Sequence, residues 1–165
     1  SFDVSGGEVF GIAGVDGNGQ SELVEAVTGL QSVDEGDIRF LGEDVTTASR
    51  RDRIDAGMAY IPEDRQERGL VMEFDLVENG LLGSQHDPEF AANGRVDWAK
   101  TRGHAEAVID EYDVRPPDAD AEAASLSGGN QQKFIVGREF ERDPELVGAS
   151  HPTGGVEVGG IGCSH

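Results

Sequence analysis

The glycine-rich segment at residues 14–21 restricts the possible folds of this chain more than any other stretch. It reads Gly-Val-Asp-Gly-Asn-Gly-Gln-Ser and matches the phosphate-loop pattern G-x-x-x-x-G-K-S/T, except that Gln20 stands in place of the lysine. Before it, the apolar run at residues 8–14 predicts a short buried strand. After it, residues 21–27 predict a helix with one apolar face. The order strand, loop and helix is therefore expected at the start of the chain.

Strand and helix patterns continue to alternate, which is typical of an α/β domain. Residues 36–41 alternate as an exposed antiparallel strand would, and residues 58–61 form an apolar run that stops at Pro62. Residues 145–149 predict one more buried strand. The pattern favours a mostly buried sheet with an antiparallel edge.

A helical subdomain is expected between these strands, from about residue 76 to residue 117. Apolar side chains recur there at helical spacing: Trp98, Ala105, Val108, Ile109 and Tyr112. This spacing favours a core position for Trp98 over a ligand-stacking role. Two prolines and the acidic run at residues 118–122 predict a linker back to the main body. His86 and His104 have no ligand-like spacing around them, so they are expected at the surface rather than in a metal site.

The charge balance limits the partners of this chain. With 33 acidic and 13 basic side chains, the formal net charge is −20, which would repel a nucleic-acid backbone and an anionic membrane surface. Lysine occurs only twice, whereas Asp, Glu and Arg are abundant. This balance suits a halophilic source, because a Debye length of roughly 3 Å at about 1 M salt screens self-repulsion. An ordinary acidic protein is the alternative.

Neither secretion nor membrane insertion is expected. No apolar run approaches the roughly 18 residues of a membrane span, and the N-terminus lacks a basic segment followed by an apolar one. The single cysteine, Cys163, allows no intrachain disulfide, which agrees with a reducing compartment. A cytoplasmic location is therefore predicted.

A second motif, Leu-Ser-Gly-Gly-Asn-Gln-Gln-Lys at residues 126–133, precedes an apolar helix face. Serine and two glycines before a helix expose N–H and hydroxyl groups suited to a γ-phosphate. A simple N-cap loop would explain Ser127, but not the whole octapeptide after a helical insertion. In the first loop, the missing ammonium removes a charged hydrogen bond worth roughly 1.5 to 3 kcal/mol, or about 10- to 100-fold in affinity. On its own, that loop could be a plain glycine-rich turn.

Together, the phosphate loop, the helical insertion and the Leu-Ser-Gly-Gly-Asn segment resemble an ATP-binding cassette (ABC) transporter ATPase over nearly the whole chain. Residues 14–23, 60–70 and 126–133 are similar to the second cassette of tandem ATPases of simple-sugar and nucleoside importers, and the Gln20-containing loop leans towards the nucleoside branch. The resemblance implies an α/β P-loop NTPase cassette with an inserted helical subdomain and an antiparallel edge sheet, truncated at both ends.

The same resemblance implies one partial ABC ATPase domain over residues 1–165. Its core would comprise about residues 1–75 and 134–165, and its helical subdomain about residues 76–133, including the signature loop. ATP and Mg²⁺ would be the cofactors. Another cassette, in the same full-length chain, and membrane permease subunits would be the partners, at the inner face of the cell membrane.

Two sets of nucleotide-binding residues follow from the resemblance. The cassette's own site would comprise Gly14, Asp16, Gly17, Asn18, Gly19, Gln20, Ser21, Glu22 and Glu63, with Ser21 also binding the metal. A second set would act in trans on ATP bound to the other cassette: Ser127, Gly128, Gly129, Asn130 and Gln131. The adenine-stacking aromatic residue of this family would lie upstream of residue 1.

Departures from the family pattern predict that the cassette's own site is hydrolytically impaired. Ser150 stands where the family has the Mg²⁺-associated aspartate, and His151 where it has the water-polarising glutamate. Glu63 replaces the Q-loop glutamine, and Asp16 and Glu22 add further negative charge. His151 is interpreted as a residue of an idle site, with a substitute general base as the alternative. A non-catalytic nucleotide-binding regulatory module is the alternative function.

Overall fold

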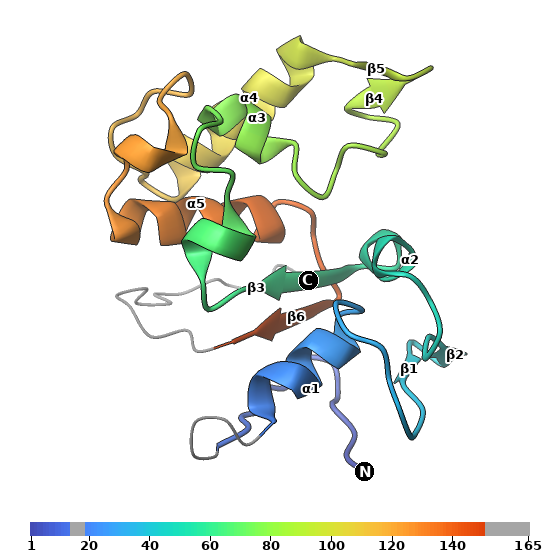
Figure 1. Ribbon diagram of the computed structural model, residues 1–165. Helices are drawn as coiled ribbons and strands as arrows, with labels where there is room; N and C mark the ends of the chain where they lie inside the picture. The colour runs from blue at the N-terminus through green and yellow to red at the C-terminus, as the bar shows by residue number, and fades with distance from the viewer. Residues whose placement is uncertain (14–18, 151–165) are drawn as a thin grey trace.

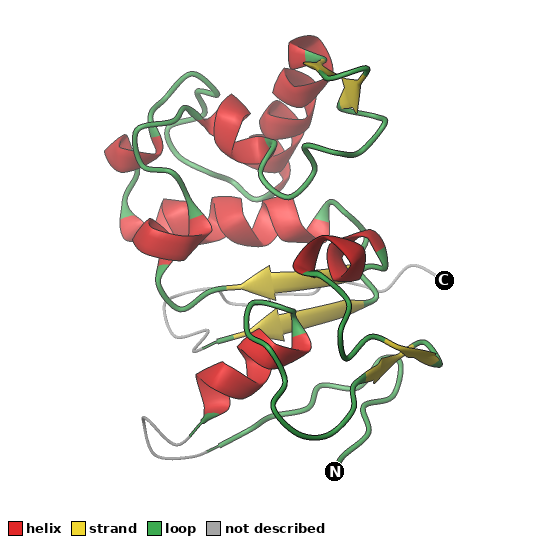
Figure 2. Ribbon diagram, turned by 45° about the vertical axis from the view of Figure 1, so that its right-hand side comes forward, coloured by secondary structure: helices red, strands yellow, loops and turns green. Residues whose placement is uncertain are grey.

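The computed structural model describes residues 1–13 and 19–150. Its centre is a parallel pair of strands, β3 (Met58–Ile61) and β6 (Leu146–Ala149), in a register that places Met58 opposite Leu146 and Ile61 opposite Ala149. Helices α1 (Gln20–Val27) and α5 (Gly128–Phe140) cover opposite faces of this pair (Figures 1 and 2). The predicted α/β class is confirmed in this layering.

Close packing holds α1 against the strand pair. A methyl group placed on Gly148 of β6 would lie 3.0 Å from side-chain carbons of both Val24 and Thr28, so a larger residue there would require these side chains to move. Strand β3 is buried along its whole length, as its apolar run predicted. Strand β6 is confirmed as a strand, but its residues are half-buried or exposed rather than buried.

The predicted strand at residues 8–14 is wrong for residues 8–13, which form no strand. Val9 is 99% exposed, and Phe10 and Ile12 are also exposed. Within the described residues the parallel sheet consists of β3 and β6, and residues 8–13 pair with neither of them. The rings of Phe2 and Phe10 stack on each other instead, with centroids 4.8 Å apart. Gly14 lies outside the described residues.

A small antiparallel ribbon precedes β3. Strands β1 (Arg39–Phe40) and β2 (Glu43–Asp44) pair through a turn in which Gly42 has a positive φ of 86°. The predicted antiparallel strand at residues 36–41 is confirmed, although it is shorter. Helix α2 (Arg50–Asp55) follows and carries a complete capping box between Ser49 and Asp52.

Helices pack above the strand pair as predicted (Figure 1). They are η1 (Arg65–Gly69), α3 (Leu76–Gly80), α4 (Trp98–Glu111) and η2 (Ala123–Ser125), and the ribbon β4 (Ala91–Ala92) and β5 (Arg95–Val96) extends from them. Their core contains Leu76, Ala105, Val108, Val114 and Phe134, all with 0% exposure. Helix α5 is continuous across residues 133 and 134, where the sequence placed the boundary between subdomain and core.

The predicted core position of Trp98 is wrong, since its side chain is 52% exposed. Trp98 is the first residue of α4, whereas α3 packs at the level of Ala105, whose Cβ lies 3.4 Å from a methyl group placed on Gly80. Seven residues of helix separate the two levels by about 10 Å. The short α3 therefore does not reach the start of α4.

The predicted surface position of His104 is wrong. His104 is half-buried rather than at the surface, its ring lies 5.2 Å from that of Phe90, and its Nε2 is buried without a partner in the described part of the chain. The expected linker at residues 118–122 is held against α3, because the Ala119 carbonyl accepts hydrogen bonds from the N–H groups of Leu76 and Val77 (3.1 and 3.2 Å). The exposed position of His86 is confirmed.

No helix within residues 1–13 and 19–150 is long and apolar enough to cross a membrane. Over the same residues, no group of three or more His, Cys, Asp or Glu side chains could hold a metal ion by itself.

Candidate nucleotide site

The predicted phosphate loop leads directly into α1. Gly19 is the N-cap of this helix, in the left-handed region (φ 91°), a conformation that glycine adopts without strain, and it has no side chain to accept a hydrogen bond from the first turn. A helix that begins after a glycine directs its first backbone N–H groups and the positive end of its dipole toward the preceding loop, an arrangement that suits an anion. Gln20 and Ser21 are half-buried in this turn, and Glu22 is exposed. Gly14, Asp16, Gly17 and Asn18 lie outside the described residues.

The carboxyl ends of β3 and β6 lie at the same side of the sheet as the start of α1 (Figure 1). Ligands of α/β proteins bind at this edge. Glu63 follows β3 and is exposed. Ser150 follows β6 and is 6% exposed, its N–H donates to the Ile61 carbonyl (3.0 Å), and its Oγ accepts from the Tyr60 hydroxyl (3.5 Å). The structure thus brings these two predicted positions together. His151 lies outside the described residues.

The signature loop enters α5 with its hydroxyl oriented by the loop itself. Ser127 is the N-cap, and its Oγ accepts hydrogen bonds from the backbone N–H (3.4 Å) and the side-chain Nδ2 (3.0 Å) of Asn130. Since both acceptor positions of this hydroxyl are used, its O–H remains for donation to a ligand. Gly128 and Gly129 are exposed, and a methyl group placed on Gly129 would touch nothing within 4 Å. The loop therefore presents donors on an open surface.

Gln131 supports the loop from inside the protein. Its side chain is 2% exposed, and Nε2 donates to the carbonyl oxygens of Ala123 (3.0 Å) and Leu126 (3.3 Å). Gln131 thus joins η2 and the loop to α5, whereas the sequence analysis placed it among the residues that contact nucleotide. Its position four residues after Ser127, next to a buried apolar face, was the available signal.

A charged cluster behind the loop fixes the orientation of Asn130. The backbone N–H of Arg115 donates to Asn130 Oδ1 (2.9 Å). The Arg115 side chain hydrogen-bonds Asp113 and lowers the pKa of its carboxyl group, and Lys133 donates to the Asp113 carbonyl (3.0 Å). Asp113 therefore remains ionised and keeps both cations in place at neutral pH.

The segment η1 lies between the two loops and was not predicted. It is a single π-helical turn, a form often found at functional sites. Arg68 forms an ion pair with Glu25 of α1, and a methyl group placed on Gly69 would lie only 2.5 Å from Cδ1 of Ile135 in α5. The turn thus joins the helix after the phosphate loop to the helix after the signature loop.

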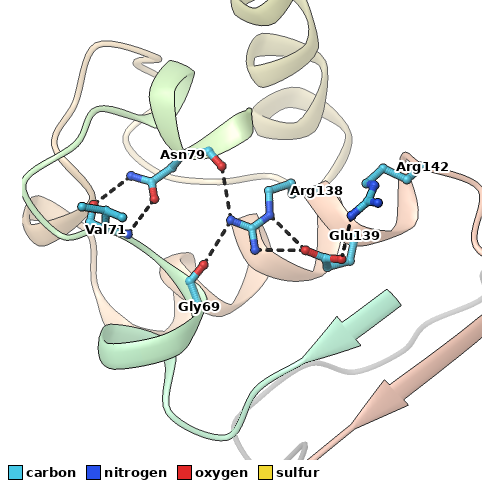
Figure 3. Close-up of polar contacts among 6 residues, drawn as sticks. All are labelled: Gly69, Val71, Asn79, Arg138, Glu139 and Arg142. Atoms are coloured by element: carbon cyan, nitrogen blue, oxygen red, sulfur yellow. Dashed lines mark hydrogen bonds and ion pairs between the residues drawn. The ribbon is translucent and has the colours of Figure 1, made fainter. Parts of the chain in front are cut away.

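A buried polar network secures the far end of this turn (Figure 3). Nη1 of Arg138 donates to the carbonyl oxygens of Gly69 (3.0 Å) and Asn79 (3.2 Å), and its guanidinium pairs with Glu139 (3.0 Å). Glu139 also contacts Arg142 (3.4 Å). Charged residues within an otherwise apolar helix face were the sequence signal for this network.

Arg53 binds the other end of α1, and the sequence patterns did not predict this role. Its side chain is 2% exposed and donates to four backbone carbonyls: Ala26 and Val27 (2.6 Å each), Thr46 (3.0 Å) and Ala48 (3.3 Å). Burial lowers the pKa of this guanidinium from its usual value. A cation at the C-terminus of α1 complements the helix dipole. Arg53 therefore holds the helix that begins at the phosphate loop.

Comparison with protein families decides the assignment, because the family described as "ABC transporter" matches residues 1–153. The chain belongs to the ABC transporter family. Solved ABC cassettes share its fold. A nucleotide-free ATP-binding cassette matches with a TM-score of 0.62 and 21% identity, over 87% of this chain and 57% of the other. A dimeric cassette bound to ADP and phosphate matches with a TM-score of 0.64 and 18% identity, over 82% of this chain and 56% of the other. The predicted P-loop NTPase cassette fold is thus confirmed.

Curated relatives of this ABC cassette are named as import ATP-binding proteins. It is 47% identical to the guanosine import protein NupO of Bacillus subtilis (100% of this chain, 32% of the relative). It is 44% identical to the nucleoside import protein NupA of Lactococcus lactis (100% and 33%) and to the glucose import protein TsgD13 of Haloferax volcanii (94% and 28%). The cassette therefore spans about a third of the length of these relatives.

Proposed function

We propose that this chain is an ATP-binding cassette of a nucleoside or simple-sugar importer, which supplies its signature loop to ATP bound on another cassette. One observation carries the proposal: Ser127, Gly128 and Gly129 present exposed donors at the start of a 13-residue helix, while the position expected for the Mg²⁺-associated aspartate is occupied by the buried hydroxyl of Ser150. The names of the relatives support the substrate class.

In this proposal the signature loop binds the terminal phosphate of the partner's nucleotide. The Ser127 hydroxyl and the first N–H groups of α5 donate to phosphate oxygens, and the helix dipole favours the negative charge. Asn130 keeps the hydroxyl oriented, and Gln131 keeps the loop on the helix. Because these groups are already in place, little ordering is needed when the two cassettes close around ATP.

The cassette's own site fits ATP better than it fits Mg²⁺. The start of α1 after Gly19 suits phosphate, and Ser21 would hold the metal together with phosphate oxygens. Mg²⁺ bound with ATP neutralises charge on the β- and γ-phosphates. Ser150 offers this ion a neutral hydroxyl that already accepts from Tyr60, whereas Mg²⁺ in such sites is usually held through a carboxylate. We therefore assign slow or no hydrolysis to this site.

The partner assignments belong to the same proposal. The second cassette would lie in the same full-length chain, and permease subunits would hold the assembly at the inner face of the cell membrane. The core of about residues 1–75 and 134–165 would carry the own-site loop, and the subdomain of about residues 76–133 would carry the loop that acts in trans.

The experiment compares two serine substitutions in the assembled importer. Ser127→Arg places a bulky cation where the partner's phosphate would bind, so ATP turnover should fall by more than tenfold. Ser32→Arg, at an exposed position after α1, is the matched control and should leave turnover unchanged. Unchanged turnover with Ser127→Arg would refute the role in trans.

A non-catalytic nucleotide-binding regulatory module is the second candidate. It is favoured by the combination of a helix start after a glycine-rich sequence with a hydroxyl, not a carboxylate, at position 150. Calorimetric titration with millimolar Mg-ATP in high salt should then give saturable heat at this cassette's own site. The absence of any heat would eliminate this candidate.

A further inference from the structure

Arg65, the first residue of η1, lies against the signature loop. A methyl group placed on Gly128 would lie 3.4 Å from Nη2 and 3.8 Å from Cζ of this arginine. Arg65 is half-buried, and its guanidinium reaches the loop. A cation thus flanks the same surface on which Ser127 and the two glycines expose their donors.

No hydrogen bond or ion pair holds the Arg65 guanidinium within residues 1–13 and 19–150. Neighbouring cations are paired: Arg68 with Glu25, Arg138 with Glu139, and Arg115 with Asp113. The carboxylate next to Arg65 in sequence, Asp64, is used as a cap and accepts from the N–H groups of residues 66 and 67 (2.9 and 3.0 Å). In a chain with a net charge of −20, a guanidinium that has no anionic partner among the residues that the structure describes is available for an external anion.

The electrostatics of this position are unfavourable without an anion. The start of α5 carries the positive end of the helix dipole, and cations are stabilised at the opposite end of a helix. Next to Gly128, Arg65 therefore adds positive charge to a helix end that is already positive. Together with the Ser127 hydroxyl and the first N–H groups of α5, the guanidinium forms a set of donors for which the described part of the chain supplies no acceptor. A phosphate group satisfies all of them at once.

The backbone of Arg65 is held in place from both sides. Asp64 caps the turn at its start, the Arg68–Glu25 ion pair ties its middle to α1, and Arg138 holds the Gly69 carbonyl at its end (Figure 3). The close approach of Gly69 to Ile135 fixes the turn against α5. The guanidinium is therefore positioned before any ligand arrives.

We propose that Arg65 binds the terminal phosphate of ATP held on the partner cassette, beside Ser127 and Gly128. The proposal rests on the function in trans proposed above and adds a phosphate-binding residue from outside the signature loop. A planar guanidinium donates two parallel hydrogen bonds to phosphate, which a lysine cannot do. Arg65 thereby favours ATP over ADP at the composite site, since ADP lacks the group that it binds.

The test uses the assembled importer with Arg65→Gln and Arg65→Lys. Losing one charged hydrogen-bonding group from phosphate should raise the KM for ATP about 10- to 100-fold in Arg65→Gln. Arg65→Lys keeps the charge but loses the two-pronged contact, so its KM should lie between those of Arg65→Gln and the unaltered protein. ADP inhibition should change less than twofold in both variants. Arg51→Gln, on the exposed side of α2, is the control and should leave the KM for ATP unchanged.

Each other outcome overturns this role. An unchanged KM for ATP in Arg65→Gln refutes it, as does an equal loss of ATP and ADP affinity or a failure of Arg65→Lys to recover any affinity, because both indicate a purely structural role. Ser127→Arg, measured in the same assembly, separates the two proposals. If it blocks turnover while Arg65→Gln changes nothing, only the role of Arg65 fails. If neither matters, the function in trans fails as well.

Discussion

Arg53 should contribute more to the stability of this cassette than any exposed charge. The Arg53→Met variant keeps much of the side-chain volume but leaves four backbone carbonyls without their donor, at the end of α1 and in the segment before α2. Hydrogen bonds to a charged group contribute about 1.5 to 3 kcal/mol each, and removing the buried charge also relieves its desolvation. We expect a net loss of about 3 kcal/mol of unfolding free energy.

Urea unfolding in high salt, followed by circular dichroism, measures this loss. Arg51→Met is the matched control on the same helix, since the Arg51 side chain is 59% exposed and its pair with Asp55 spans 3.7 Å. Such a surface pair contributes about 0 to 1 kcal/mol. Arg53→Lys should fall between the two, because an ammonium reaches fewer of the four carbonyls. A loss below about 1 kcal/mol in Arg53→Met would refute the stabilising role of the Arg53 hydrogen bonds.

Three further predictions concern packing, pH and salt. Gly137→Ala should cost about 1 to 3 kcal/mol in urea unfolding, because the added methyl group would lie 2.7 Å from Tyr112 and 2.8 Å from Val108; an unchanged midpoint would contradict it. Burial lowers the pKa of His104 below its usual 6.5, so the unfolded chain binds the extra proton and stability should fall as the pH drops below about 6.5. His104→Gln should remove that part of the pH dependence, and identical profiles would contradict this. With a net charge of −20, the cassette should lose circular dichroism signal in dilute buffer and regain it in molar salt; full signal at low salt would favour the ordinary acidic protein.

Sequence patterns correctly predicted the elements whose structure depends mainly on neighbouring residues in the chain. The run at residues 58–61 is a strand because four apolar residues stop at a proline, and the face of residues 21–27 forms a helix after a glycine-rich turn. Residues 8–13 carry a similar apolar run, but a strand also needs a partner edge, which their own sequence does not contain. The core position of Trp98 was mispredicted for the same reason, because its exposure depends on the length of another helix, α3.

In the candidate site too, features set by local sequence were predicted and features set by distant segments were not. The octapeptide at residues 126–133 predicted the signature loop, because the chemistry of an exposed helix start is local. It did not predict that Gln131 points inward or that Arg65 lies beside Gly128, since both depend on which segments meet in space. The π-helical turn η1 depends on Arg138 and Ile135, about seventy residues later in the chain. Contacts of this kind become visible only in the folded molecule.

The most direct measurement of the central claim compares two substitutions within this cassette, in the assembled importer. Changing the signature loop with Ser127→Arg should lower the rate of ATP hydrolysis by more than tenfold, because the loop serves the partner's nucleotide. Changing the cassette's own site with Ser150→Ala should leave that rate within about twofold. The reverse pattern, with hydrolysis lost in Ser150→Ala and kept in Ser127→Arg, would contradict the account.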